Sequence, residues 1–185
     1  MNACKKSGNQ YLYFIVVLAL STGARKGEIL NLKWENISFE RQVITLEETK
    51  NGERRVLPLQ GYAYDLMCEF FKHRNIVSDY LFPGQSALYP VDIKKSWENA
   101  IKIANLTDFR FHDLRHSAAS YLAMDGASIT DIAEVLGHKT LQMVKRYSHL
   151  SEAHTKKVVA SMNNKIFTET MSAQEAEERK EDEYV

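Results

Sequence analysis

The chain has 185 residues, 44% of them hydrophobic and 26% charged, which is ordinary for a folded domain. This length accommodates one domain with a sizeable core, or one domain and a tail. Two cysteines, Cys4 and Cys68, are too few for a disulfide framework or a four-cysteine metal site, and they favour a reducing compartment.

The formal net charge of zero hides an uneven distribution. Seven acidic and two basic residues fall within 169–185, so the preceding chain carries a net charge of about +5. A mildly basic body is compatible with a polyanionic partner, although an ordinary solvated surface gives the same charge. We expect a folded body over 1–167 and an acidic, flexible tail over 168–185.

The first apolar run, YLYFIVVLAL over 11–20, follows Lys5 and Lys6 and has the order of a signal peptide. It is too short to span a bilayer, and it continues into STGARKGEILNL without a cleavage-site pattern. We therefore expect a buried helix over 9–21 and a second helix over 25–32, separated by Thr22-Gly23.

The periodicity then changes over 36–59, where β-branched residues flank the sequence KNGE. Asn-Gly is a strong hairpin signal, so two or three antiparallel strands are expected, with Lys50 beside the turn. Helices are expected to return at 61–74, 91–104, 112–125, 129–136, 141–148 and 151–163. Four residues fit helix caps: Gly126 and Gly137 at C-termini, Ser128 and Ser151 at N-termini. The predicted fold class is mainly α with a small antiparallel β-sheet (α+β).

The segment FHDLRHSA, 111–118, allows three interpretations. Two histidines four apart, His112 and His116, resemble a zinc hydrolase helix with His138 as a third ligand. The intervening acid is Asp113 where that motif has Glu, and Arg115 would place a fixed cation beside the metal. Alternatively, His112 and Arg115 share a helix face and converge on a phosphate, whose oxygens match a guanidinium fork. A solvent-facing polar helix start remains the simplest interpretation.

Other candidates for phosphate chemistry are individually weak. Arg25 follows a Gly-containing turn at a helix start, where free N–H groups favour anions, and Glu28 could orient its guanidinium group. Lys50 could protonate a leaving oxygen, although a lysine beside such a turn is usually solvated. His138 in LGHKT follows a helix C-cap. Tyr147 in VKRYSHL has basic neighbours that favour the phenolate, and a histidine could take its proton.

The order of these motifs is more specific than any one of them. Arg25 in TGARKGE, Lys50 at a hairpin, HDLRH, LGHKT and then Tyr147 resemble the catalytic domain of tyrosine recombinases, the phage-integrase family, over about residues 10–163. The resemblance implies a site-specific DNA recombinase that cleaves and rejoins DNA through a 3′-phosphotyrosyl intermediate, integrating or excising a mobile element or prophage. It implies double-stranded DNA as partner, a homotetramer on paired sites, no metal or cofactor, and a location at the nucleoid in a bacterial cytoplasm.

The resemblance also implies a role for each matched residue. Six residues would carry the chemistry: Tyr147 as nucleophile, Arg25 and Arg115 on the non-bridging oxygens, His138 supporting them, Lys50 as general acid, and His112 as proton acceptor or, alternatively, mainly as a phosphate ligand. Two would support the site: Glu28, which holds it together, and His116, a structural residue. This hypothesis requires the two guanidinium groups to converge and Tyr147 to lie outside the hydrophobic interior.

Two alternatives and one departure accompany the resemblance. A type IB topoisomerase would share the tyrosine chemistry, and a DNA-binding regulator would keep the fold without catalysis. Family members usually carry an N-terminal DNA-clamping domain, but only 24 residues precede Arg25. We therefore expect an isolated catalytic domain over 1–167 that binds DNA weakly and with strong salt dependence. Residues 151–167 could dock onto a neighbouring subunit.

Overall fold

The computed structural model describes residues 1–47, 54–74, 76–138, 140–151 and 154–166. Its α-helices are α1 (Asn2–Lys5), α2 (Leu12–Thr22), α3 (Lys26–Leu30), α4 (Gly61–Lys72), α5 (Lys94–Ile103), α6 (Asp113–Met124) and α7 (Ile129–Leu136). Its 3-10 helices are η1 (Trp34–Asn36), η2 (Leu141–Met143) and η3 (Lys145–Ser151), and its strands are β1 (Ile37–Ser38), β2 (Val43–Leu46) and β3 (Arg55–Pro58). A last helix covers 154–166.

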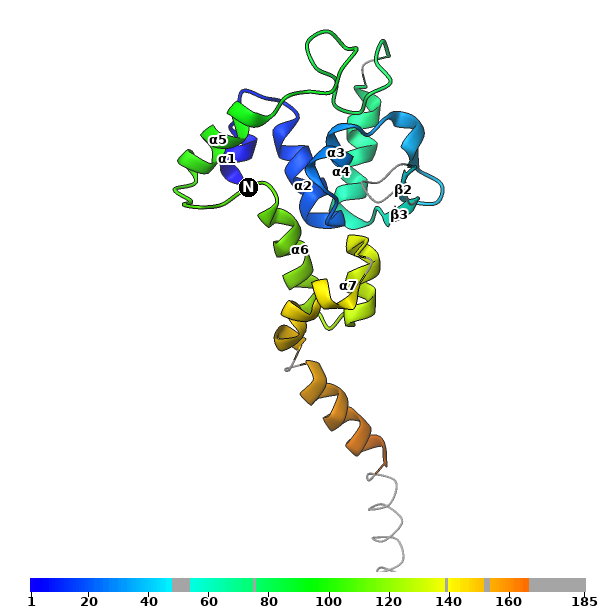
Figure 1. Ribbon diagram of the computed structural model, residues 1–185. Helices are drawn as coiled ribbons and strands as arrows, with labels where there is room; N and C mark the ends of the chain where they lie inside the picture. The colour runs from blue at the N-terminus through cyan, green and yellow to red at the C-terminus, as the bar shows by residue number, and fades with distance from the viewer. Residues whose placement is uncertain (48–53, 75, 139, 152–153, 167–185) are drawn as a thin grey trace, which may run out of the picture.

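Helix α2 forms the centre of the larger core. Most of its side chains are buried, including Leu12, Ile15 and Leu18, and it contacts α1, α3, α4 and α6. Figure 1 shows α2 between α1 and α5 on one side and α3 and α4 on the other. The apolar run over 11–20 is therefore a core helix, as expected. Within the described residues, no helix has the length and apolarity that crossing a membrane requires.

The three strands form one antiparallel sheet in the order β1-β2-β3. Ile44 pairs with Leu57, and both side chains are buried in the larger core. Alternation along a strand places every second side chain on the same face, so Arg55, Leu57 and Leu59 share the inward face while Val56 is exposed. Lys50 and the KNGE turn lie outside the described residues.

Helix α6 joins the larger core to a second, smaller one. Its first half contributes Leu114 to the larger cluster, and its second half contributes Ala119 and Ala123 to a cluster with α7, Val144 and Tyr147. In Figure 1, α6 runs from α2 down to α7 and η3, and the helix over 154–166 projects beyond them. The segment after residue 111 is thus attached to the body chiefly along α6.

The predicted fold class is confirmed, and most helices lie within a few residues of their expected bounds. Residues 129–136 form α7 as predicted, with Ser128 accepting from the Asp131 N–H and Gly137 in the left-handed conformation. The helix expected over 141–148 is wrong, because η2 and η3 occupy this stretch. Helix α1 was not expected, and the last helix spans 154–166 in place of 151–163. The acidic segment 168–185 lies outside the described residues.

Candidate active site

Arg25 is held by Glu28 at the start of α3. Gly23 takes a left-handed conformation at the end of α2, with φ of 61°, and turns the chain into the next helix. The Glu28 carboxylate accepts from the Arg25 backbone N–H at 2.8 Å and from Arg25 Nη1 at 2.7 Å. The side chain of Glu28 is 7% exposed and that of Arg25 is 24% exposed. Glu28 therefore holds both the backbone and the guanidinium group of Arg25, whose side chain is still partly exposed to solvent.

Arg115 lies deeper, on the buried side of α6. Its Nη1 donates to the Gly23 carbonyl at 2.6 Å, and its Nη2 donates to the Leu136 carbonyl. Burial, followed by the charges of Arg25 and Arg55, lowers the Arg115 pKa to about 10, so the group stays charged at neutral pH. The two arginines expected to act together thus belong to one cluster and do not point to separate surfaces.

Sequence reasoning missed a third arginine in this cluster. Arg55 Nη2 donates to Glu28 at 2.8 Å, and Arg55 Nη1 donates to the same Leu136 carbonyl that Arg115 binds. The alternation of side chains along β3 could have revealed it. Arg55 lies two and four residues before the buried Leu57 and Leu59, so all three side chains point to the same face.

His138 directly follows the α7 C-cap Gly137, which has φ of 63°. Burial lowers the His138 pKa to about 4, and the charges of Arg115, Arg25 and Arg55 act in the same direction. Its Nδ1 is buried and has no hydrogen-bond partner among the described residues. His138 is therefore a neutral imidazole at neutral pH, able to donate one N–H to an anion without adding charge.

Tyr147 departs from expectation in two respects. It is only 6% exposed and packs in the smaller core, so the expectation that it lies outside the interior is wrong for this conformation. Burial also raises the Tyr147 pKa, outweighing the charges of Arg146 and Arg115, so the arginines do not make it a phenolate. The phenol is therefore protonated and buried, and the role expected of it as a nucleophile would require both a base and a movement.

The hydroxyl of Tyr147 lies 2.6 Å from Nδ1 of His116. Burial and the charge of His112 lower the His116 pKa, so this imidazole is neutral at neutral pH and can accept from the phenol. His112, the expected proton acceptor, is exposed at the start of α6, its ring 5.0 Å from that of His116 in an edge-to-face arrangement. In this conformation His116, expected to be structural, is the histidine that contacts the Tyr147 hydroxyl.

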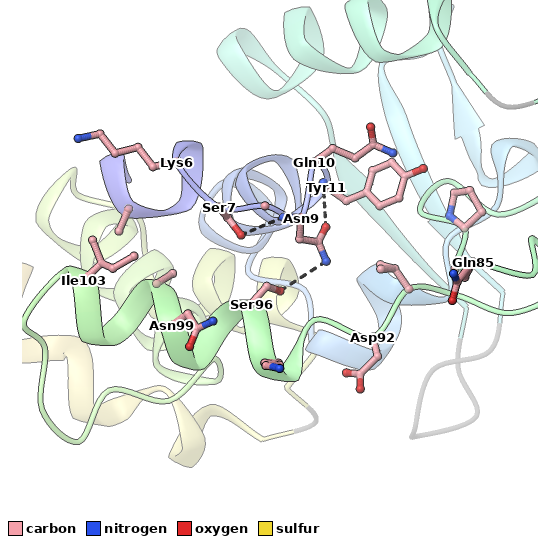
Figure 2. A pocket seen from close by; sticks show the side chains of 17 residues that line it. Lys6, Ser7, Asn9, Gln10, Tyr11, Gln85, Asp92, Ser96, Asn99 and Ile103 are labelled. Atoms are coloured by element: carbon pink, nitrogen blue, oxygen red, sulfur yellow. Dashed lines mark hydrogen bonds between the residues drawn. The ribbon is translucent and has the colours of Figure 1, made fainter.

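A cleft of about 800 Å³ opens beside Arg25 and Glu28, lined further by residues of η1 and β2. A second cavity, of about 740 Å³, lies between α1, α5 and the loop over 83–92, and none of the expected site residues lines it. Figure 2 shows that it is lined by polar groups, with Asn9 donating to Ser96. Within the described part of the chain, no group of three or more His, Cys, Asp or Glu residues could hold a metal ion.

The chain is similar to known proteins over most of its length. The sequence model of the phage integrase family matches residues 1–154. The chain belongs to the phage integrase family. Among curated relatives, a shufflon-specific DNA recombinase of Escherichia coli is 39% identical over 145 residues, covering 77% of this chain and 35% of the relative. The integrase of Salmonella phage P22 is 33% identical over 152 residues, covering 76% of this chain and 39% of the relative.

Solved structures of other proteins share the fold of this chain. The catalytic domain of bacteriophage HP1 integrase superposes with a TM-score of 0.64 at 29% identity, covering 86% of each chain. The Tn1549 transposon integrase in complex with circular intermediate DNA has the same fold, with a TM-score of 0.68 at 20% identity, covering 85% of this chain and 63% of that one. The chain spans little more than a third of the length of the two curated phage-integrase relatives described above.

Proposed function

We propose that this chain is the catalytic domain of a tyrosine site-specific recombinase, which cleaves and rejoins DNA through a 3′-phosphotyrosyl intermediate and integrates or excises a mobile element or prophage. The observation that carries the proposal is the single cluster of Arg25, Arg55 and Arg115, which Glu28 and the Leu136 carbonyl join, together with the charges of these arginines acting on the nearby His138. Several fixed cations with one carboxylate suit a phosphodiester, whose transferring charge is spread over its non-bridging oxygens.

The proposed reaction uses only groups of this chain. The phenol oxygen of Tyr147 attacks the scissile phosphorus while Arg25 and Arg115 bind the non-bridging oxygens. The bond from phosphorus to the 5′ oxygen breaks, Lys50 gives that oxygen a proton, and a histidine takes the phenol proton. The free 5′-hydroxyl of another strand then attacks the phosphotyrosine, restoring the phenol, so the energy of the phosphodiester is conserved.

A conformational step precedes cleavage in this scheme. Tyr147 is buried against His116, while Arg25 is the most accessible of the three clustered arginines, so η3 must shift to bring the phenol to a phosphate. We assign His116 as the proton acceptor at the start of this movement, because its neutral imidazole already contacts the hydroxyl. His112 is the competing acceptor, as the resemblance implied.

The partners follow from the same proposal. Double-stranded DNA is the substrate, and a homotetramer on two paired sites is the active assembly, acting at the nucleoid in a bacterial cytoplasm. Structural relatives support the DNA partner, because the Tn1549 integrase was solved in complex with circular intermediate DNA and the XerH recombinase was solved bound to a palindromic difH substrate.

The test begins with a pool of nicked suicide duplexes carrying random sequence around the nick, incubated with the full chain in EDTA. Duplexes captured as covalent protein–DNA adducts over several rounds then serve as defined substrates.

We expect adducts that disappear in Tyr147→Phe and fall by about 100-fold or more in Arg25→Ala, since each removes a group acting on the transferring phosphate. A pool that never yields Tyr147-dependent adducts would exclude strand cleavage by this chain. Relaxation of supercoils without joining of paired sites would favour the topoisomerase.

Lys50 has a separate test. Lys50→Ala should slow cleavage of an ordinary duplex but recover on a substrate whose bridging 5′ oxygen is replaced by sulfur, because a thiolate leaves without a proton. Equal defects on both substrates would exclude Lys50 as the general acid.

A further inference from the structure

The residues Arg54 and Arg55 are adjacent in sequence, but the structure places their side chains in different environments. Arg54 is 60% exposed and pairs with the equally exposed Glu47 at 3.3 Å, an interaction worth little in water. Arg55 begins β3, and its side chain is only 10% exposed. Neighbouring residues of a strand point to opposite faces, which explains the difference. The two arginines form a matched pair, one inward and one outward.

The inward arginine closes a chain of hydrogen bonds through the site. One oxygen of Glu28 accepts from Arg25 Nη1, and the other accepts from Arg55 Nη2 at 2.8 Å. Arg55 Nη1 donates to the Leu136 carbonyl, which also accepts from Arg115. Arg55 is thus the link between the acid that fixes one phosphate-binding arginine and the carbonyl that fixes the other.

The backbone around the cluster is shaped to admit this side chain. Gly137 ends α7 with φ of 63°, and a Cβ there would collide with the guanidinium group of Arg55, approaching its Cδ to 2.8 Å. Gly137 therefore serves two purposes, since it closes the helix and leaves the space that Arg55 fills. The residue after it is His138, so the position of this histidine also depends on the Arg55–Leu136 contact.

Exposure separates Arg55 from Arg25. Arg25 is 24% exposed and borders the cleft, whereas Arg55 is 10% exposed and does not line it. Both guanidinium contacts of Arg55 go to protein groups, one a carboxylate and one a backbone carbonyl. Its fork geometry satisfies both at once, which the single ammonium of a lysine does poorly.

We propose that Arg55 is a positioning residue for DNA cleavage, which holds Glu28 and the α7 C-terminus in register so that Arg25, Arg115 and His138 converge on one phosphate. This inference rests on the recombinase function proposed above. It also gives strand β3 a direct part in the site, because Arg55 of β3 donates to Glu28 and to the Leu136 carbonyl.

The experiment measures single-turnover adduct formation at saturating DNA, with duplexes captured as Tyr147-dependent adducts. Arg55→Met should slow cleavage by about 30- to 100-fold, the scale of a displacement of about 1 Å at a reacting centre. Arg55→Lys should lose about tenfold, because a lysine keeps one of the two contacts. DNA affinity should change by less than about threefold in both, since Arg55 faces protein groups. Arg54→Met is the control and should cleave at the wild-type rate.

A double-mutant cycle tests whether Arg55 acts through Glu28. The double variant Arg55→Met with Glu28→Gln should be no more than about twofold slower than the slower single variant, because both break the same link. Three results would overturn the proposal. The rate defects of the two single variants could multiply in the double variant, Arg54→Met could slow cleavage as much as Arg55→Met does, or the defect of Arg55→Met could lie in weaker DNA binding. Circular dichroism at the assay temperature accompanies each measurement. Unfolding of both Arg55→Met and Arg55→Lys would make Arg55 a stability residue and overturn it as well.

If the wild-type chain forms no Tyr147-dependent adduct, the proposed function fails, and the positioning role of Arg55 in DNA cleavage fails with it. If the adduct forms and Arg55→Met cleaves normally, the function stands and the positioning role fails.

Discussion

At the scale of single residues, His138 makes the stability of the folded chain depend on pH. Its folded pKa of about 4 lies below its ordinary value of 6.5. The unfolded chain therefore binds the proton more readily between these values, and stability is lost as the pH falls through that window. If the whole pKa shift contributed to stability, the free energy of unfolding would fall by about 2 kcal/mol between pH 7 and pH 5. We reduce this to about 1 kcal/mol because solvent screens a partly exposed group.

The measurement is urea unfolding at pH 7 and pH 5. The decrease in unfolding free energy between the two should be smaller by about 1 kcal/mol in His138→Gln than in the wild-type chain. Replacing the exposed His73 by glutamine provides the control and should leave the decrease unchanged. An identical pH dependence in His138→Gln would show that the histidine is solvated in the native state.

The contact between Tyr147 and His116 predicts how the rate of DNA cleavage changes at acidic pH. His116 must be neutral to accept the phenol proton, and burial and the charge of His112 lower its pKa from 6.5, so the adduct-forming rate should be level near neutral pH and fall only at pH values below this ordinary histidine pKa. His116→Gln should cleave about 100-fold more slowly and lose this acidic limb, since the base is removed. Loss of the limb in His112→Gln alone would identify the other histidine as the base.

Some residues of the site were predictable from the sequence and others were not. Arg25, Glu28, Arg115 and His138 come from motifs at turns and helix ends, where local rules fix the direction of a side chain, and the structure gathers them. The partner of Tyr147 was not predictable, because His112 and His116 lie one turn apart and only the packing of η3 decides between them. Arg55 needed a register for β3, and a strand of four residues gives few alternations from which to read one.

At the scale of elements, local caps made α7 predictable and packing made η2 and η3 unpredictable. Ser128 and Gly137 bound α7 through contacts within a few residues. The segment after it buries Val144 and Tyr147, three residues apart. That spacing suits a 3-10 helix, with three residues per turn, as well as an α-helix, and the sequence does not separate the two. The choice depends on how the segment fits against α6.

The turn between α2 and α3 gives a prediction about a glycine. Gly23 has φ of 61°, and a Cβ there would collide with the side chain of Leu136. Gly23→Ala should lower the free energy of unfolding by about 2 kcal/mol or more, combining left-handed strain with the collision. Gly27, inside α3 with open space around it, is the matched control, and Gly27→Ala should leave stability unchanged or raise it by up to about 1 kcal/mol. Thermal or urea unfolding measures both, and equal effects would contradict the assigned turn.

At the scale of the whole molecule, charge separates the body from its end. The chain is neutral overall, yet the residues before 169 carry a net charge of about +5 that the last 17 residues offset. The described basic groups include the arginine cluster at the site, which is where a polyanion would be attracted. A negative segment on the same chain competes with DNA for such a surface, and this competition weakens as salt screens it.

Deleting residues 169–185 should therefore strengthen binding to a non-specific duplex by about three- to tenfold at 50 mM salt, and the gain should shrink above about 200 mM. Fluorescence anisotropy of a labelled duplex across a salt series measures both quantities. A control chain keeps the full length but has the seven acidic residues of this segment replaced by Gln or Asn, and it should match the deletion because charge is the only property removed. Unchanged affinity in both variants would mean that the acidic segment stays clear of the DNA-binding surface. A gain in the deletion alone would point to steric obstruction by the segment.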